Sequence, residues 1–184
     1  MVAPAWAGAA AGGGRCAVGD LSVIQNLRFF ASAYGLRGPR RAGRINWALG
    51  EFELAPYADA TSRDLPLGFK QRMALACALM HEPGVLFLDE PTSGVDPLAR
   101  REFWRRINAL ADQGVTVLVT THFMDEAEYC DHLVIMAQGR ILASGTSESL
   151  KTAARTAALP APTMEDAFIS LIAASNAKPE EQAA

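Results

Sequence analysis

Two short runs of apolar residues, separated by a helical pattern, limit most strongly what this chain can fold into. The runs span residues 85–88 and 115–120, and continuous apolar runs of this length are typical of strands that a sheet buries on both faces. The residues between them, 98–113, place apolar side chains at helical spacing, namely Phe103, Ile107, Leu110 and Ala111. A strand, a helix and a second strand in this order predict a right-handed crossover in a parallel sheet, and so an α/β fold.

The composition is that of an ordinary globular protein. The chain has 184 residues, which is long enough for one domain with a core. Of these residues, 50% are hydrophobic and 20% are charged, as in ordinary soluble domains. The net charge of −3 argues against a nucleic-acid partner, because proteins that bind the phosphate backbone show a basic balance. No stretch approaches the about 20 apolar residues that span a bilayer, so any membrane role must run through a partner. Three cysteines without a C-x-x-C pair are typical of a reducing cytoplasm.

Four segments are expected along the chain. Residues 1–19, rich in Ala and Gly, are predicted to be a disordered leader unrelated to the rest. Residues 20–82 are predicted to form a helical subdomain, 83–151 the α/β core, and 152–184 a C-terminal helix and tail.

Local signals place the smaller elements. Ser22 and Gln25 form a capping-box pattern that predicts the start of a helix. The basic segment 37–44 is interpreted as a solvated loop in preference to a binding patch, and a further helix is expected from about residue 70 to 81. Near the C-terminus, residues 132–136 and 140–144 are predicted to be two strands joined by a turn.

Asp89 and Glu90 directly follow the first apolar run. The C-terminal end of a parallel strand is where open α/β sheets bind ligands. An Asp at this position suits Mg²⁺, and a neighbouring Glu can take a proton from the water that attacks a γ-phosphate. Taken alone, the pair is more compatible with a polar turn, because Asp-Glu-Pro also favours turns.

The surrounding sequence favours the catalytic interpretation of Asp89 and Glu90 over the turn. The stretch 86–96, followed by Thr121-His122 after the second run, closely resembles the ABC ATPase family. The match is to the Walker B strand, the catalytic carboxylate, the D-loop and the switch histidine, in that order, and the resemblance extends over residues 20–173. It implies a partial P-loop NTPase fold, in which helices flank a parallel sheet and a helical subdomain is added.

The resemblance also implies roles for single residues. Asp89 would hold Mg²⁺ through water, and Glu90 would be the general base. His122 would contact the γ-phosphate and the attacking water. Ser93 and Asp96 would belong to the D-loop, which communicates across a dimer.

Residues 65–69 stand where this family carries its signature loop, usually Leu-Ser-Gly-Gly-Gln. That loop precedes a helix whose N-terminus points at the γ-phosphate bound to the other subunit, which suits an anion. Here Pro66, Leu67 and Phe69 depart from the consensus, and the loop is interpreted as a functional variant like those of bacterial multidrug-type exporters. The resulting candidate nucleotide-binding residues are Leu65, Pro66, Leu67, Gly68, Phe69, Lys70, Gln71, Ser93 and Asp96.

Two motifs of the family are missing from the sequence. None of the three lysines, Lys70, Lys151 and Lys178, follows a Gly, so there is no Walker A loop of the form G-x-x-x-x-G-K-[S/T]. The Q-loop glutamine expected shortly before Asp20 is also missing. The interpretation is an N-terminally truncated or misread chain that lacks the Walker A strand, with unpaired strand edges and marginal stability.

The leading functional hypothesis is an ATP-binding, ATP-hydrolysing subunit of an ABC exporter, with Mg²⁺ and ATP as substrate. Such a subunit would be cytoplasmic, held on the inner face of the cell membrane by its permease, and paired head-to-tail with a second nucleotide-binding domain. Alternatives are a non-catalytic partner that lends its signature loop to an intact ABC subunit, or an inactive fragment. A soluble ABC protein of translation or DNA repair is disfavoured, because no heptad run of a coiled-coil insertion is seen.

Overall fold

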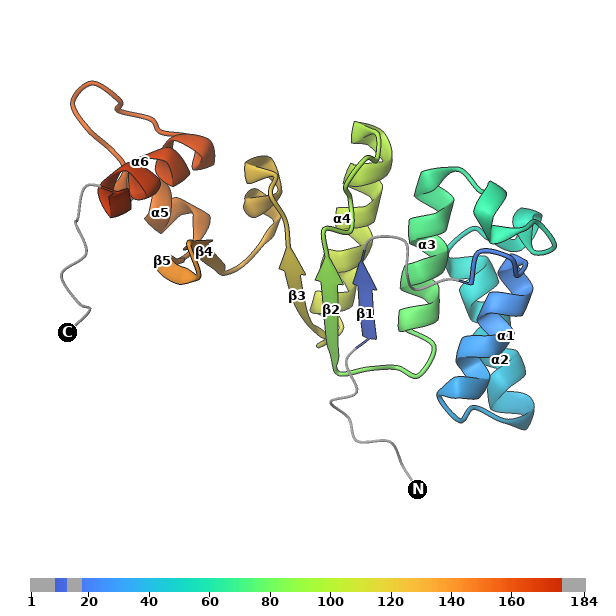
Figure 1. The fold of residues 1–184 in the computed structure, drawn as a ribbon. Coiled ribbons are helices and arrows are strands. Elements are labelled where there is room, and N and C mark those ends of the chain that lie inside the picture. Colours follow the sequence, from blue (N-terminus) through green and yellow to red (C-terminus); the bar gives the residue numbers. More distant parts are fainter. Residues whose placement is uncertain (1–8, 13–17, 177–184) are drawn as a thin grey trace. The chain divides into compact units, whose positions relative to one another are not determined.

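The computed structural model describes residues 9–12 and 18–176, which form two compact units, one up to Thr121 and one from His122 (Figure 1). The first unit holds β1 (Ala9–Gly12), α1 (Val23–Ala33), α2 (Gly38–Glu51), α3 (Leu67–Ala78), β2 (Val85–Asp89), α4 (Pro97–Asp112) and β3 (Thr116–Thr120), with short 3-10 helices at Ala55–Tyr57 and Ser62–Asp64. The second unit holds the 3-10 helix η3 (Met124–Tyr129), β4 (Leu133–Ala137), β5 (Arg140–Gly145), α5 (Ser147–Ala153) and α6 (Met164–Asn176). Among the described helices, none has the length and apolarity to cross a membrane.

The first unit is built on a parallel sheet in the order β1–β2–β3 (Figure 1). The predicted strand–helix–strand crossover is therefore confirmed, with α4 between β2 and β3. Residues 9–12 fall within the predicted leader, yet they pair with β2 from Ala9–Leu86 to Gly12–Asp89. At these four residues the structure differs from the prediction, because an extended segment can satisfy its backbone groups on the edge of β2 whatever its side chains are. The rest of the leader up to residue 17, and the tail after 176, lie outside the described residues.

Burial of the sheet is one-sided, which contradicts the expectation of strands buried on both faces. Leu86 and Leu88 are buried, whereas Phe87 is 43% exposed and its register partner Leu118 is 57% exposed. A continuous apolar run indicates that a strand is suited to burial on both faces. Whether both faces are buried depends on which other segments pack against them. In the described part of the chain, β3 pairs only with β2. The marginal stability expected from unpaired edges stays a prediction.

The helices of the first unit confirm one local prediction and correct another. Ser22 begins α1 with the predicted capping box, since its Oγ accepts from the Gln25 N–H at 3.3 Å and Gln25 Oε1 accepts from the Ser22 N–H at 2.8 Å. The predicted loop at 37–44 is wrong, because α2 begins at Gly38, directly after its N-cap Arg37, and includes Arg40, Arg41 and Arg44. Pro39 lies in the first turn of α2, where its missing N–H removes no helical hydrogen bond and its fixed φ favours the helix.

The second unit has its own core beneath a two-stranded sheet. β4 and β5 form the predicted antiparallel hairpin, and the turn has positive φ at Gln138 (51°) and Gly139 (73°). Two consecutive positive φ values are typical of the tight turns whose twist matches a hairpin. One cluster of buried hydrophobic residues in this unit comes from η3, β4, α5 and α6, namely Ala127, Ile135, Leu150 and Met164.

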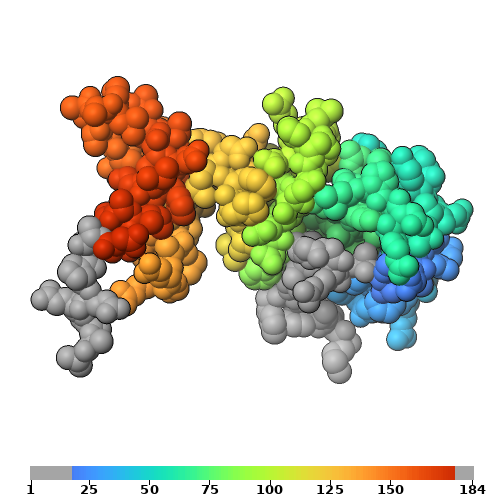
Figure 2. All heavy atoms as spheres, turned by 45° about the horizontal axis from the view of Figure 1, so that its top comes forward, coloured from blue at the N-terminus to red at the C-terminus, as the bar shows by residue number. Residues whose placement is uncertain are grey.

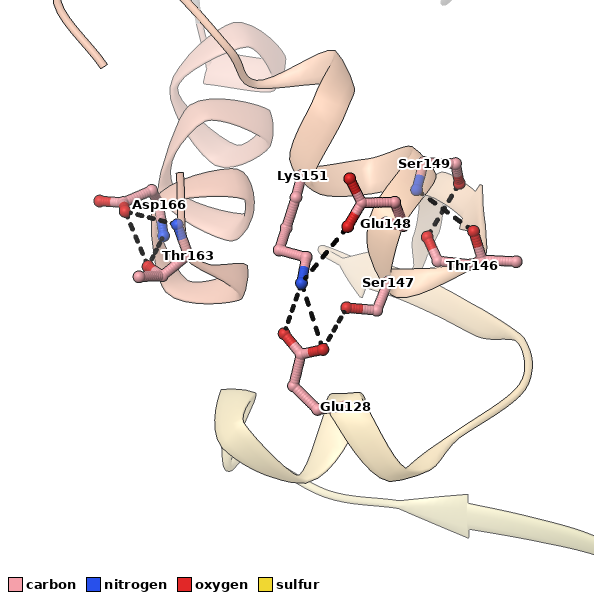
Figure 3. Close-up of polar contacts among 8 residues, drawn as sticks. All are labelled: Glu128, Thr146, Ser147, Glu148, Ser149, Lys151, Thr163 and Asp166. Carbon is pink, nitrogen blue, oxygen red and sulfur yellow. Dashed lines mark hydrogen bonds and ion pairs between the residues drawn. The ribbon is translucent and has the colours of Figure 1, made fainter. Parts of the chain in front are cut away.

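Polar contacts reinforce this packing (Figure 3). Lys151 on α5 places its Nζ 2.9 Å from Glu128 Oε1, and Ser147 Oγ donates to Glu128 Oε2 at 2.9 Å. The Lys151 hydrogen bond is the main cause that lowers the pKa of Glu128. At the start of α6, Asp166 accepts from the Thr163 N–H at 2.8 Å and from Thr163 Oγ1 at 2.7 Å, and the backbone bond is the main cause that lowers the pKa of Asp166.

We expect the second unit to lose stability in acid through these two carboxyls. A carboxyl whose pKa is lower in the folded state contributes stability that is present above the unfolded pKa and is lost as the pH falls through the folded pKa. Both groups have lowered pKa values, so the loss is expected below the ordinary carboxyl range of about pH 4. Urea denaturation from pH 7 to pH 3 should show a flatter pH dependence for a Glu128→Gln, Asp166→Asn double variant. Identical profiles for the wild type and the variant would contradict this.

Candidate functional site

The carboxyl ends of β2 and β3 bring Asp89 beside Thr120. The two residues are register partners at the last position of each strand, and Asp89 Oδ1 accepts from Thr120 Oγ1 at 2.5 Å. The carboxylate is exposed, so one of its oxygens is oriented while the group remains accessible. Sequence reasoning missed Thr120, although a polar residue at the end of an apolar run was the available signal.

Glu90 follows in a strained backbone conformation. Its φ is 44°, in the left-handed region that non-glycine residues enter at a cost of about 1 kcal/mol or more. Its N–H donates to the Thr120 C=O at 3.0 Å and also lies 3.3 Å from Thr120 Oγ1. Strained residues of this kind are concentrated at functional sites, where the surrounding structure holds them in place. The chain thus turns sharply at Glu90 and leaves its side chain exposed at the strand ends.

The predicted D-loop, residues 93–96, forms a tight turn into α4. The Ser93 N–H donates to the Glu90 C=O at 3.2 Å, and the side chain of Ser93 is exposed. Asp96 caps α4, because its Oδ1 accepts from the N–H groups of Leu98 at 3.1 Å and Ala99 at 3.0 Å. The Asp96 carboxylate therefore has a structural partner within its own chain, and a role across a dimer stays a prediction.

The predicted signature segment, residues 65–71, lies at the start of α3. This helix begins at Leu67, three residues before the predicted start at Lys70, with Pro66 as its N-cap. The N–H groups of Phe69 and Lys70 donate to the Pro66 C=O at 3.0 and 3.1 Å. Pro66 has no side-chain oxygen with which to cap the first N–H groups of α3, as the usual Ser would. Despite the departure from the consensus, the segment still begins a helix, and a helix N-terminus favours an anion.

The signature segment and the D-loop touch each other within this chain. A methyl group on Gly94 would lie 3.2 Å from Leu67 Cδ2, and one on Gly68 would lie 3.7 Å from the Ala99 Cβ. Gly94 also has a φ of 75°, which favours glycine. Leu67, which replaces the first glycine of the family consensus, thus packs over the glycine of the D-loop.

His122 is placed differently from the other candidates. It is the first residue of the second unit and is exposed, with its ring centroid 4.1 Å from that of Phe123. Asp89, Glu90, Ser93, Asp96 and the segment 65–71 all belong to the first unit. The role of His122 toward a γ-phosphate therefore stays a prediction.

The donor set at Asp89 suits a hard cation that brings its own water. No cluster of three or more His, Cys, Asp or Glu side chains that could hold a metal occurs within residues 9–12 and 18–176. Mg²⁺ is usually bound through one or two carboxylates together with water and substrate phosphates. The single accessible carboxylate of Asp89 fits that mode.

Comparison with known proteins places these features in a family. The chain is 58% identical over 154 residues to YbhF of Escherichia coli, a probable multidrug ABC transporter ATP-binding protein. The chain belongs to the ABC ATPases. The alignment covers 84% of this ABC ATPase chain and 27% of YbhF, so the chain spans about a quarter of that relative. A second relative is Nod factor export ATP-binding protein I of Cupriavidus metallidurans, 44% identical over 71% of this chain and 44% of that protein.

Solved structures agree with the assignment of the fold. An ATP-binding subunit of an ABC transporter matches with a TM-score of 0.72 and 29% identity, over 89% of this chain and 68% of the other. The cbiO1 protein of Clostridium perfringens, part of the ABC transporter complex cbiONQ, matches with a TM-score of 0.67 and 28% identity, over 77% and 59%. Residues 24–123 of this ABC ATPase match the family described as "AAA domain, putative AbiEii toxin, Type IV TA system", to which more than half of the chain therefore belongs.

Proposed function

We propose that this chain supplies the Walker B carboxylates, the D-loop and the signature loop of an ABC transporter ATPase that couples ATP hydrolysis to export. The observation that supports the proposal is the arrangement of two carboxylates at the ends of β2 and β3. Thr120 orients Asp89 by a hydrogen bond, and Glu90 follows directly with a strained backbone. The names of the relatives, a probable multidrug transporter protein and a Nod factor export protein, support export as the direction of transport.

The chemistry follows from the side chains at the strand ends. The substrate is ATP with Mg²⁺, and Asp89 holds the cation through water. Glu90 accepts a proton at its carboxylate from the water that attacks the γ-phosphate. A contact from His122 to that phosphate stays a prediction, because His122 belongs to the second unit. The turn at Glu90 fixes its backbone through Thr120, which limits the positions that the carboxylate can reach.

The signature loop acts on a second subunit in this proposal. The N-terminus of α3 carries the positive end of a helix dipole and N–H groups without a side-chain cap. It faces the γ-phosphate held by a second nucleotide-binding domain in a head-to-tail dimer. A transmembrane permease holds both domains at the cytoplasmic face of the membrane.

A second candidate function is that of a partner that lends its signature loop without hydrolysing ATP itself. Two observations favour this function. The start of α3, which the lending role needs, is formed. In the sequence, by contrast, no lysine follows a glycine, as the Walker A loop would require. In that case the 65–71 segment would matter to the ATP turnover of an intact subunit and Glu90 would not.

Mixing experiments separate the two functions. We expect this chain to raise the ATP turnover of full-length YbhF, measured as phosphate release. Gly68→Asp should abolish the increase, because a carboxylate at the start of α3 repels a phosphate, while a Cβ at residue 68 would meet the Ala99 Cβ at the ordinary contact distance of 3.7 Å. An increase that survives Glu90→Gln favours the lending function. No change in YbhF turnover on addition of the wild-type chain would sink it.

A further inference from the structure

Glu53 occupies a backbone position where glycine is preferred. After α2 ends, the Glu53 N–H donates to the Gly50 C=O at 3.1 Å and the Leu54 N–H donates to the Leu49 C=O at 2.9 Å. This pair of bonds is a Schellman motif, which places its central residue in the left-handed region. Glu53 has a φ of 56°, at a cost of about 1 kcal/mol or more relative to glycine. A strained backbone that is kept in this way suggests that the Glu53 side chain has a role.

The Glu53 carboxylate joins two arginines from different helices. Its Oε2 lies 2.6 Å from Arg72 Nη1 on α3, and its Oε1 lies 2.8 Å from Arg106 Nη2 on α4. The two arginine side chains are 20% and 15% exposed, whereas the Glu53 side chain is 62% exposed, so solvent reaches these ion pairs from the carboxylate side and screens them in part. The Arg72 hydrogen bond, followed by the charges of the two arginines, lowers the pKa of Glu53 and keeps it ionised.

The two joined helices are those that begin with the candidate site. α3 starts in the signature segment, and the Arg72 guanidinium lies 5.1 Å from the ring centroid of Phe69 in that segment. α4 starts at Asp96 of the D-loop. Figure 2 shows the surface of α4 running beside that of α3, and Leu67 packs over Gly94 where both helices begin. Contacts at Glu53 and at Leu67 thus fix α3 against α4 at two separate points.

We propose that Glu53 is a positioning residue, which holds the signature loop against the D-loop by joining Arg72 to Arg106. Its consequence for ATP turnover rests on the proposed function, whereas the positioning itself rests on the contacts alone. Its ion-pair partners, Arg72 and Arg106, are not among the candidate residues that act on the nucleotide, so Glu53 acts through the two helices.

Glu82 offers a matched control with the same chemistry in another place. It also has a left-handed φ, of 58°, and its carboxylate also lies near two arginines, 2.8 Å from Arg40 and 3.4 Å from Arg44. Both of those arginines belong to α2. The Glu82 bridge therefore joins the segment that follows α3 to α2, and its ion pairs are with α2 and not with α4.

Hydrogen exchange of the backbone amides tests the positioning directly. We expect Glu53→Gln to speed exchange of the amides of residues 69–72 and 98–100 by about tenfold, the change produced by losing a charged hydrogen bond. Glu82→Gln should leave both segments unchanged, and Glu53→Asp should restore slow exchange, because Asp keeps the charge and tolerates a left-handed backbone. Equal exchange in these segments for Glu53→Gln and Glu82→Gln would overturn the proposal.

A glycine variant separates positioning from general stability. Glu53→Gly relieves the backbone strain, so its unfolding midpoint should lie above that of Glu53→Gln while exchange in the two segments stays fast. Slow exchange in this variant would show that the backbone, and not the carboxylate, holds the helices.

The functional arm uses the mixture with YbhF. Glu53→Gln should reduce the increase in turnover severalfold through kcat, with little change in the KM for ATP, and Glu82→Gln should retain the increase. If the wild-type chain gives no increase, the lending function fails, while the exchange result still decides the role of Glu53. An unchanged increase with Glu53→Gln would limit its role to local structure.

Discussion

Glu90→Gln is expected to abolish Mg²⁺-dependent ATP hydrolysis in a chimera that carries this chain in place of the matching segment of YbhF. A glutamine amide keeps the shape of the side chain but cannot take a proton from the attacking water. General-base catalysis typically contributes about 10²–10⁴-fold to the rate, so phosphate release should fall by that order. Because the same left-handed backbone is kept at residue 90, the folding of the chimera should change little.

The control for this variant is nucleotide binding. ATP affinity of the chimera, followed by equilibrium binding of a fluorescent analogue, should stay within about a factor of two, since the base acts in the chemical step. Asp89→Asn should instead raise the Mg²⁺ concentration needed for activity, because it removes the charge that holds the cation. Unchanged turnover in Glu90→Gln would remove Glu90 as the general base.

Those features of the fold that depend on neighbouring residues could be predicted from the sequence. The capping box at Ser22 and the turn at Gln138-Gly139 are set by side chains and backbone within a few residues. The crossover from β2 to β3 was predictable as well, because two apolar runs and a helical pattern leave few other topologies.

Features that depend on distant partners were not predictable in the same way. The composition of residues 9–12 gives no strand signal, and β1 exists because β2 offers an edge. Exposure of Phe87 likewise depends on what covers the sheet and not on the run itself. At 37–44 the basic, Gly- and Pro-containing sequence indicated a loop, although Gly38 and Pro39 in this order begin α2.

The residues of the candidate site likewise differ in whether the sequence could predict them. Asp89 and Glu90 stand out as a motif, so sequence alone was sufficient to propose them. The hydrogen bond from Thr120 to Asp89 depends on the register of two strands, which the motif does not specify. Glu53 carries no motif, because its importance comes from a backbone angle and from two arginines that lie 19 and 53 residues away.

The buried face of α4 differs from the expected one. Phe103 and Ile107 are buried as predicted, whereas Ala111 of the expected face is exposed and Trp104, outside that face, is only 2% exposed. Adjacent helical positions point about 100° apart, so a helix that buries both Phe103 and Trp104 has a wide apolar stripe. A narrow stripe drawn through Phe103, Ile107 and Leu110 misses the largest side chain of the helix.

Trp104→Ala is therefore expected to destabilise the chain by about 3–5 kcal/mol, through lost burial and the cavity that remains. That is a large part of the about 5–15 kcal/mol that holds a typical domain together. Guanidinium denaturation followed by circular dichroism measures the loss. Leu98→Ala on the same helix is the control, because Leu98 is 72% exposed and the change should stay within about 0.5 kcal/mol. Equal midpoints for the two variants would show that α4 packs through another face. Because α4 carries Asp96 at its start and Arg106 in its second half, that result would also contradict the placement of the D-loop and of the Glu53 bridge.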